Sequence, residues 1–391
     1  MKFISFPSFI SPLIATFVDN FLKCRPEPVG CRPERSEGFY DGFIMKVVDK
    51  DMWLVVVNVF AASKKAGSVW KSAAGMLDEA GLDYKVRFTG GVDNAIAISR
   101  KAAAGGYRKF IAVGGDGTVH DVLNGIAEFV VSASSDSVDP DGGVSLSDFT
   151  LGVIPLGSGN DWVKSVCVPR DLRKSISLIA AGRTAAQDVV KVTVMDPSGP
   201  DAASWMAAEP LGISYMANIG GVGLDARVCE IVNRKKEQGR RGKQLYVSAL
   251  LYCIMNRVPV RAKVVCDGAV VFDGNYLSIA FGVGKYSGGG MRQTPLAELG
   301  DGLLDVTVIP DIPLWTIAKE VPKLFTGNFH KVPVLTQAKC REVFVLPYRE
   351  SDAEPAEVDG EVIGRAPVKM EVLTDQINVI VGPDFVRMGR R

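Results

Sequence analysis

The sequence predicts two domains: an α/β domain with a mainly parallel sheet, then a larger, β-rich antiparallel domain of the sandwich type. Up to about residue 185, short apolar runs alternate with segments of helical periodicity, a pattern typical of βαβ units and parallel sheets. From Asp188 onward the chain carries a series of short β-type runs instead, which is typical of antiparallel sheets. With 391 residues, 47% of them apolar, the chain is long enough to bury two cores.

The predicted domains comprise residues 45–185 and 186–391, with the end of the chain free to return to the first domain. Residues 1–44 are expected to lie outside the fold as a disordered or extraneous extension. Within them, residues 24–38 contain a near-duplicated unit rich in Pro, Arg and Glu, a composition that cannot bury a core. Met45 is then the expected start of the folded chain.

The first domain is expected to repeat a strand followed by a helix. Apolar runs predict strands at 53–57 and 84–88, and further strands starting at Phe110 and Thr150. Helical spacing or helix-stop signals predict helices at 68–80, 92–104, from about 119 onward, and at 171–181. Residues 131–149 are rich in Ser, Asp and Gly and are expected to form a long surface loop without chemistry.

The second domain is expected to be built mainly of strands. Strand-like runs occur at 189–194, 213–218, 261–265, 276–281 and 304–309. A helical insertion is predicted at about 225–256. A basic cluster at 234–243 is interpreted as a solvated helix end, with docking on anionic lipid head groups as the alternative.

Two glycine-rich turns dominate the first domain. Residues 114–118 (Gly-Gly-Asp-Gly-Thr) follow one predicted strand, and residues 155–161 (Pro-Leu-Gly-Ser-Gly-Asn-Asp) follow the next. Such turns bring backbone N–H groups close to phosphate at the carboxyl edge of a parallel sheet. The carboxylate of Asp116 predicts contact with a metal, a sugar hydroxyl or a proton that moves. Neither turn has the spacing of the Gly-x-x-x-x-Gly-Lys or Gly-x-Gly-x-x-Gly loops.

Composition excludes several classes of function. The net charge of +1 argues against a nucleic-acid partner. Seven cysteines without a Cys-x-x-Cys pair argue against a disulfide framework and a structural zinc site, and fit a cytoplasmic protein. The chain has only two histidines, which argues against a histidine-rich metal site and against a Ser-His-Asp triad. No stretch is long enough to cross a bilayer, so no transmembrane segment is expected.

The two turns, with Asn-Gly at 124–125, resemble motifs of the bacterial diacylglycerol kinase and sphingosine kinase family of lipid kinases. The similarity continues through residues 218–226, 287–291 and 301–305, and it covers most of residues 53–383. The resemblance implies an α/β ATP-binding domain, a β-rich lipid domain and an active site in the cleft between them. The chain departs from the family after Asn58, where Val59 and Ala62 replace Pro and Gly.

The resemblance implies roles for individual residues. The residues expected to bind ATP are Asn58, Thr89, Gly114, Gly115, Asp116, Gly117, Thr118 and Ser158. The Asp-Gly-Glu turn at 359–361 supplies the base that accepts the proton of the lipid hydroxyl. Glu361 is favoured as the base, Asp359 is expected to support it, and Asp116 is a third candidate.

A structural Mg²⁺ is implied at a second turn. By resemblance, the carboxylate of Asp301 and the backbone carbonyls of Glu298 and Leu303 hold the ion, since a hard cation prefers oxygen ligands. The family often has an acidic residue before this aspartate, where this chain has Gly300.

The sequence therefore predicts an ATP- and Mg²⁺-dependent lipid kinase that phosphorylates a hydroxyl of diacylglycerol, a sphingoid base or another lipid. The substrate is expected at a membrane surface, with the enzyme cytoplasmic or peripheral to the membrane, and a homodimer is compatible with the family. One alternative is a NAD kinase-like enzyme, which shares the Gly-Gly-Asp-Gly loop but not the motifs at 155–161 and 288–291. The other is an inactive lipid-binding or regulatory protein, supported by the altered loop after Asn58.

Overall fold

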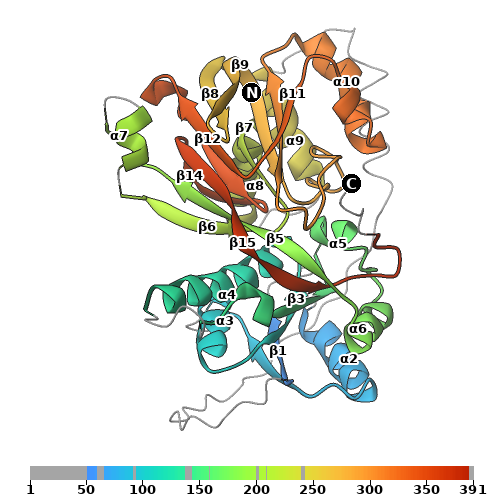
Figure 1. Ribbon diagram of the computed structural model, residues 1–391. Helices are drawn as coiled ribbons and strands as arrows, with labels where there is room; N and C mark the ends of the chain where they lie inside the picture. Colours follow the sequence, from blue (N-terminus) through green and yellow to red (C-terminus); the bar gives the residue numbers. More distant parts are fainter. Residues whose placement is uncertain are drawn as a thin grey trace.

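The computed structural model describes residues 51–59, 66–90, 94–136, 143–157, 159–199, 202–207, 209–238 and 243–386. The expected extension 1–44, the expected start at Met45 and the predicted site residue Ser158 lie outside these ranges. The first domain lies below the second in Figure 1, and two long strands, β5 and β15, run from one to the other.

The first domain is a parallel sheet covered by helices on both faces (Figure 1). Its strands are β1 (Trp53–Val57), β2 (Tyr84–Phe88), β3 (Lys109–Gly114) and β4 (Thr150–Pro155). They pair in parallel in the order β2-β1-β3-β4. The helices are α2 (Ala66–Glu79), α3 (Ala95–Ala104), α4 (Asp116–Asp136), the short α5 (Trp162–Ser165) and α6 (Leu172–Ala181).

The period of two along each strand explains the two helix layers, because successive side chains point to opposite faces. Leu54 and Val56 of β1 lie in a buried cluster with side chains of α3 and α4. Val55 and Val57 lie in a second cluster with side chains of α2 and α6. Both faces of β1 are thus buried, as its unbroken apolar run predicts.

The predicted loop at 131–149 is wrong at its start. Helix α4 continues to Asp136, and residues 146–148 form a short 3₁₀ turn. Among the side chains of α4 that the structure describes, Phe129 and Val130 are the last that pack against the core, and the helix continues beyond them into the serine-rich stretch despite its weak helical propensity.

The second domain is antiparallel. Its strands are β5 (Thr184–Val194), β6 (Gly212–Met216), β7 (Ile219–Gly223), β8 (Val260–Cys266), β9 (Ala269–Gly282), β10 (Leu304–Pro310), β11 (Thr336–Cys340), β12 (Glu342–Pro347), β13 (Pro355–Val358), β14 (Glu361–Arg365) and β15 (Val368–Ile380). The predicted helical insertion forms two helices, α8 (Leu224–Glu237) and α9 (Lys243–Met255). The short α7 (Ala202–Ala207) and α10 (Leu314–Thr326) complete the described elements.

Strand β15 joins the two domains into one sheet. It pairs antiparallel with β12 in the second domain, and its end pairs in parallel with β4 of the first, at Asn378 and Val379. Strand β5 follows β15 through both domains. The fold class predicted from sequence is confirmed, and the continuous sheet fixes the second domain above the carboxyl edge of the parallel strands.

Candidate active site

The two glycine-rich turns meet at the carboxyl edge of the parallel sheet. The N–H groups of Leu156 and Gly157 donate to the carbonyl of Gly114, at 2.7 and 3.2 Å. A Cβ atom on Gly157 would lie only 2.6 Å from the Cα of Gly115, so this approach requires glycine. The second turn therefore packs directly on the first.

The strand ends beside the first turn carry polar groups. The side-chain amide of Asn58, after β1, donates to Thr118 Oγ1 at 3.0 Å. A Cβ on Gly114 would lie 2.1 Å from the same hydroxyl oxygen, so Gly114 leaves room for Thr118. Thr89 follows β2, and its N–H donates to the carbonyl of Val57 at 2.9 Å. The structure thus brings Asn58, Thr118 and the glycines of the first turn together at the carboxyl edge of the parallel sheet.

Two carboxylates flank Gly159 in the second turn. A Cβ built on Gly159 would lie 3.1 Å from Asp116 Oδ2 and 3.5 Å from Asp161 Oδ2. The backbone N–H of Trp162 donates to Asp116 Oδ1 at 3.0 Å. Burial raises the pKa of the Asp116 carboxyl, and the nearby charge of Asp161 raises it further. Such a pair favours a cation between the carboxylates.

Asp161 also connects the two domains. Its Oδ1 lies 2.5 Å from Lys164 Nζ, and its Oδ2 accepts the N–H of Gly289 at 2.6 Å. Gly289 belongs to the Ser-Gly-Gly-Gly-Met stretch of the second domain. Asp161 precedes α5 but makes no side-chain capping bond.

The Asp-Gly-Glu turn approaches the glycines from the second domain. It links β13 to β14, with Asp359 and Gly360 at φ values of 53° and 92°. The carboxylate of Asp359 accepts the N–H groups of Ala217, Asn218 and Ile219 at 2.9, 2.9 and 3.3 Å. Asp359 is therefore already fully engaged as an acceptor, which suits a positioning role.

Glu361 has a different environment. Its side chain is exposed, and its Oε1 lies 3.3 Å from the position that a Cβ on Gly117 would occupy. The amide of Asn233 on α8 is 3.5 Å from its Oε2. This carboxylate thus faces the first glycine turn across the gap between the domains.

Helix α4 adds His120 and Asn124 to the site, two residues for which no role was expected. Asp116, His120 and Asn124 are spaced four apart and share one helix face. His120 Nδ1 lies 3.1 Å from Asp359 Oδ2. Asn124 exchanges hydrogen bonds of 2.8 Å with the backbone N–H and carbonyl of Tyr215 on β6. The four-residue spacing of polar side chains after the glycine turn was the available signal.

The His120 and Asp121 side chains are both electrostatically perturbed. Burial lowers the pKa of His120, but the hydrogen bond and charge of Asp359 raise it more, and the net shift is upward. Burial raises the pKa of the Asp121 carboxyl to about 6, against a lowering by His120 and with a smaller upward contribution from the charge of Glu361. Asp121 is thus a titratable group near the Asp-Gly-Glu turn.

An apolar cavity in the second domain ends at a buried polar network. Asp225 Oδ2 accepts Ser278 Oγ at 2.6 Å and the amide of Gln293 at 2.8 Å. The cavity is open to solvent. Its apolar lining includes Leu250, Ile254, Ile317, Val321, Leu324 and Phe329. Asp225 lies in the motif at 218–226, but no role was expected for it or for Gln293.

A lysine ammonium group from strand β11 contacts the turn that is predicted to hold Mg²⁺. Asp301 Oδ1 accepts the N–H of Leu303 at 3.1 Å, and its Oδ2 lies 3.0 Å from Lys339 Nζ. The same ammonium is 3.1 Å from Asp305 Oδ2. Among the described residues, no three His, Cys, Asp or Glu side chains are grouped as metal ligands. The Asp301 carboxylate is thus paired with an ammonium group in this structure, and its role with the carbonyls of Glu298 and Leu303 as Mg²⁺ ligands stays a prediction.

Steric crowding explains why residue 300 is a glycine. A Cβ on Gly300 would lie 2.5 Å from the carbonyl oxygen of Ala186 on β5, so the acidic side chain of the family does not fit here. The turn is held instead by Asp188, whose carboxylate accepts the N–H of Gly302 at 2.8 Å.

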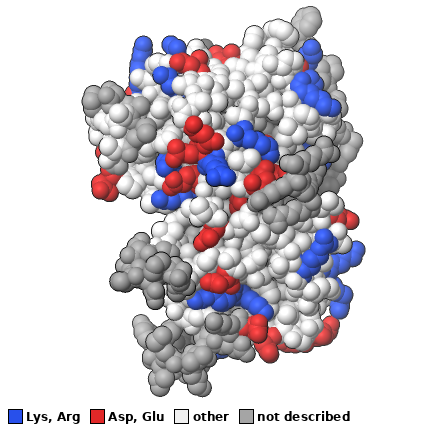
Figure 2. All heavy atoms as spheres, viewed as in Figure 1, with Lys and Arg blue, Asp and Glu red and all other residues white. Residues whose placement is uncertain are grey.

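The surface carries charges of both signs. Figure 2 shows Lys and Arg interspersed with Asp and Glu on the face that it presents, in line with the net charge of +1. None of the helices in the described ranges is both long and apolar enough to span a bilayer.

Two family models match consecutive parts of the chain. The diacylglycerol kinase catalytic domain matches residues 52–192, and the YegS C-terminal NAD kinase beta sandwich-like domain matches residues 219–381. Similar proteins include the "Probable lipid kinase YegS-like" of Xanthomonas euvesicatoria, 28% identical, over 66% of this chain and 74% of that protein. The diacylglycerol kinase of Staphylococcus carnosus is 24% identical, over 79% and 88% of the two chains.

The fold is also found among solved structures. A diacylglycerol kinase from Bacillus anthracis superimposes with a TM-score of 0.59 at 19% identity, covering 86% of this chain and 98% of that one. At this identity the likeness concerns the fold alone.

Proposed function

Because the chain belongs to the diacylglycerol kinase family of lipid kinases, we propose that it transfers the γ-phosphoryl group of ATP to a hydroxyl of a membrane lipid. The observation that carries this proposal is the position of Glu361. Its carboxylate lies in the second domain and faces the glycine turn of the first at Gly117. An acceptor hydroxyl between them would meet a base on one side and phosphate-binding amides on the other.

The first domain supplies the phosphate site. Helix α4 begins at Asp116 within the first glycine turn, so the backbone N–H groups of its first turn and the positive end of its dipole point toward this place. Asn58 fixes the hydroxyl of Thr118. Thr89 and Ser158 complete the proposed ATP contacts. Binding of this kind positions and neutralises the phosphates, which is most of what phosphoryl transfer requires.

Asp161 is already paired with Lys164 and with the N–H of Gly289, so Asp116 is the carboxylate that would hold the nucleotide-bound Mg²⁺. The Asp116 carboxylate lies beside Gly159, and the buried Asn160 Oδ1 beside Gly157 has no hydrogen-bond partner among the described residues. Hard oxygen donors of this kind suit the ion. When bound, Mg²⁺ neutralises charge that develops on the phosphate oxygens.

Glu361 is the proposed general base. The lipid hydroxyl oxygen attacks the γ-phosphorus, its proton passes to the Glu361 carboxylate, and the bond to the bridging oxygen of ADP breaks. Asp359 holds the turn through backbone bonds, so that it positions Glu361. A base placed in this way contributes about 10²–10⁴ in rate.

The second domain would receive the lipid. The cavity lined by α9 and α10 is apolar and ends at the Asp225 network, which suits an acyl chain with a polar end. Diacylglycerol and a sphingoid base both have this character. The enzyme would then work at the periphery of a membrane, since its acceptor resides there.

The test is transfer of labelled γ-phosphate from ATP to a panel of lipids and to NAD. We expect a labelled lipid, with kcat reduced about 100-fold or more in Asp116→Asn and Glu361→Gln. The matched control is Asp83→Asn, an exposed carboxyl just before β2, at the opposite edge of the sheet. Labelled NADP would identify a NAD kinase-like enzyme. ATP binding without any labelled product would favour the inactive binding protein, and either result would overturn the proposal.

A further inference from the structure

Large apolar side chains are exposed at the end of α9 and the start of α10. Tyr252, Met255 and Val258 are 61%, 56% and 63% exposed, and Leu314 and Trp315 are 39% and 71% exposed. We call these five residues the aromatic patch. Exposed apolar residues are ordinary when scattered, but a contiguous group marks a contact surface.

Polar bonds hold the two parts of the patch together. Arg257 Nε lies 3.1 Å from Asp311 Oδ1, and its Nη2 donates to the carbonyl of Ile312 at 3.2 Å. Arg257 directly precedes Val258, and Ile312 lies two residues before Leu314. The end of α9 is thereby tied to the start of α10, so that the patch is a fixed surface.

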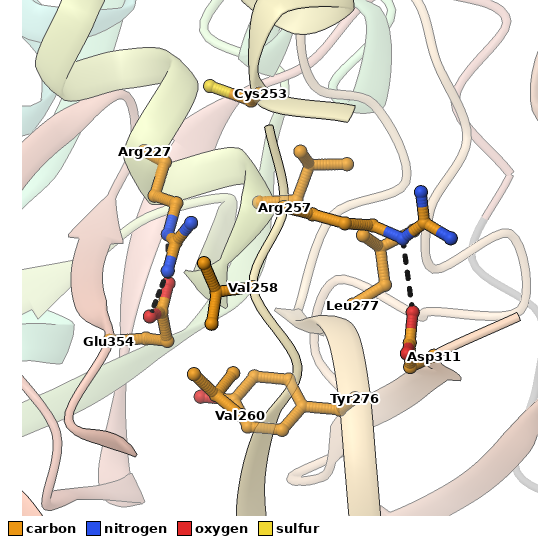
Figure 3. Close-up of a pocket in the computed structure, with 10 residues that line it drawn as sticks. Arg227, Cys253, Arg257, Val258, Val260, Tyr276, Leu277, Asp311 and Glu354 are labelled. Atoms are coloured by element: carbon orange, nitrogen blue, oxygen red, sulfur yellow. Dashed lines mark hydrogen bonds and ion pairs between the residues drawn. The ribbon is translucent and has the colours of Figure 1, made fainter. Parts of the chain in front are cut away.

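A small hollow beside Val258 of the patch is lined by two ion pairs and carries no net charge. In Figure 3, Val258 lies between the Arg257–Asp311 pair and the Arg227–Glu354 pair. Each guanidinium has a carboxylate partner, so the two pairs compensate within the hollow. Its role is to support the patch rather than to attract a charged ligand.

The same two helices line the apolar cavity with their inner faces. Leu250 and Ile254 of α9 and Ile317, Val321 and Leu324 of α10 line it. The surface that would contact a partner and the wall of the proposed lipid site are thus opposite faces of the same helices. A partner seated on the patch would therefore lie against the helices that line the cavity.

We propose that the aromatic patch docks on the surface of a lipid bilayer, which delivers the acceptor lipid to the cavity between α9 and α10. This inference rests on the proposed function. Trp and Tyr are the side chains that favour the membrane–water interface. Lys319 is exposed one turn after Trp315, and basic side chains lie over the α10 region in Figure 2, which favours anionic phospholipid.

The tryptophans of this chain allow a direct test. Trp315 is 71% exposed, whereas Trp53, Trp162 and Trp205 are buried and Trp70 is half-buried. Vesicles of phosphatidylglycerol and brominated phosphatidylcholine should therefore quench the emission of Trp315 selectively, without nucleotide present. Trp315→Phe, which keeps an aromatic ring, should abolish most of this quenching.

Sedimentation with the same vesicles measures affinity. Trp315→Ser and Tyr252→Ser should each weaken binding at least tenfold. The matched control is Leu211→Ser, because Leu211 is 64% exposed in the turn before β6, and its loss should leave binding unchanged. Phosphorylation of a short-chain, water-soluble diacylglycerol should be unaffected in all three variants.

Three results would overturn the proposal. One is full binding by the patch variants, and another is an equal loss in Leu211→Ser. The third is a dimer in solution that dissociates in Trp315→Ser while vesicle binding persists, which would make the patch a subunit interface. Vesicle binding without any kinase activity would instead leave the docking surface in place and remove the proposed function.

Discussion

Asp121 shows how its surroundings set the pKa of a single carboxyl group. Burial raises its pKa from 3.8 to about 6, while His120 lowers it and the Glu361 charge adds a smaller upward shift. The folded protein therefore binds this proton more tightly than the unfolded chain, and its contribution to the free energy of unfolding falls as pH rises through 6. Replacing Asp121 with a neutral side chain should prevent this fall in the free energy of unfolding.

We expect Asp121→Asn to raise the free energy of unfolding at pH 8 by up to about 3 kcal/mol. Near pH 4 the gain should nearly vanish, because the folded wild type is already protonated there. Urea unfolding at both pH values measures the difference. Asp83→Asn, at an exposed carboxyl, should show no such pH dependence. A gain that is equal at pH 4 and pH 8 would mean that Asp121 does not titrate as proposed.

Motif residues could be predicted from sequence where backbone geometry dictates the residue type. The glycines at 114 and 157 are needed because a Cβ would overlap Thr118 or Gly115, and such turns are visible in the sequence. The partners of Asp359 could not be predicted in this way. His120 lies 239 residues away from it, and only the completed fold brings the two together.

At the scale of elements, local pattern predicted the strands of the first domain well, because each is an apolar run between turn signals. It failed at the serine-rich end of α4, where the helix continues past the buried Val130 despite an unfavourable composition. The helix α10 and the strand β11 were not predicted, and neither belongs to a recognised motif. Lys339 of β11 reaches Asp301 only through the antiparallel pairing of β10 with β11.

The pairing of β10 with β11 leads to a prediction for the Asp301 turn. Without its lysine, the turn would leave Asp301 and Asp305 facing each other with no cation. We expect Lys339→Met to lower Tm by about 2–4 °C, and Mg²⁺ without nucleotide to recover part of that loss. Burial raises the pKa of Asp305 to about 6 even with the lysine present, so the uncompensated pair is costly.

Thermal unfolding in EDTA and in millimolar Mg²⁺ measures this effect. Lys331→Met is the matched control, since Lys331 is exposed in the 3₁₀ turn after α10. Wild-type protein should gain little from Mg²⁺. A large Mg²⁺-dependent gain in wild type that is lost in Asp301→Asn would show that the turn binds the structural Mg²⁺ implied by the family despite Lys339.

At the scale of the whole molecule, strands β5 and β15 make the two domains one continuous sheet. The gap between Glu361 and Gly117 therefore has a defined width, because opening it would break ladder hydrogen bonds. Side chains lock the same boundary from both sides: Asp161 binds the N–H of Gly289, and His120 binds Asp359. The second contact is the one that depends on protonation.

His120 is expected to stabilise the domain boundary most at low pH. Its pKa is raised above 6.5, because Asp359 outweighs burial and Asp121 and Glu361 add to the shift. The stabilisation is therefore complete below the unfolded pKa and is lost as pH rises through the folded value. His120→Asn should cost about 1–3 kcal/mol at pH 6 and less at pH 9.

Amide hydrogen exchange locates the effect. The N–H groups of residues 217–219 bond to Asp359, and they should exchange faster in His120→Asn, since the carboxylate loses the partner that orients it. The other histidine, His330, contacts the carbonyl of Gly327 within the second domain, so His330→Asn should leave these amides unchanged. Equal exchange in both variants would mean that Asp359 is held by its backbone donors alone. The proton on His120 would then have no part in setting the distance between Glu361 and the glycine turn.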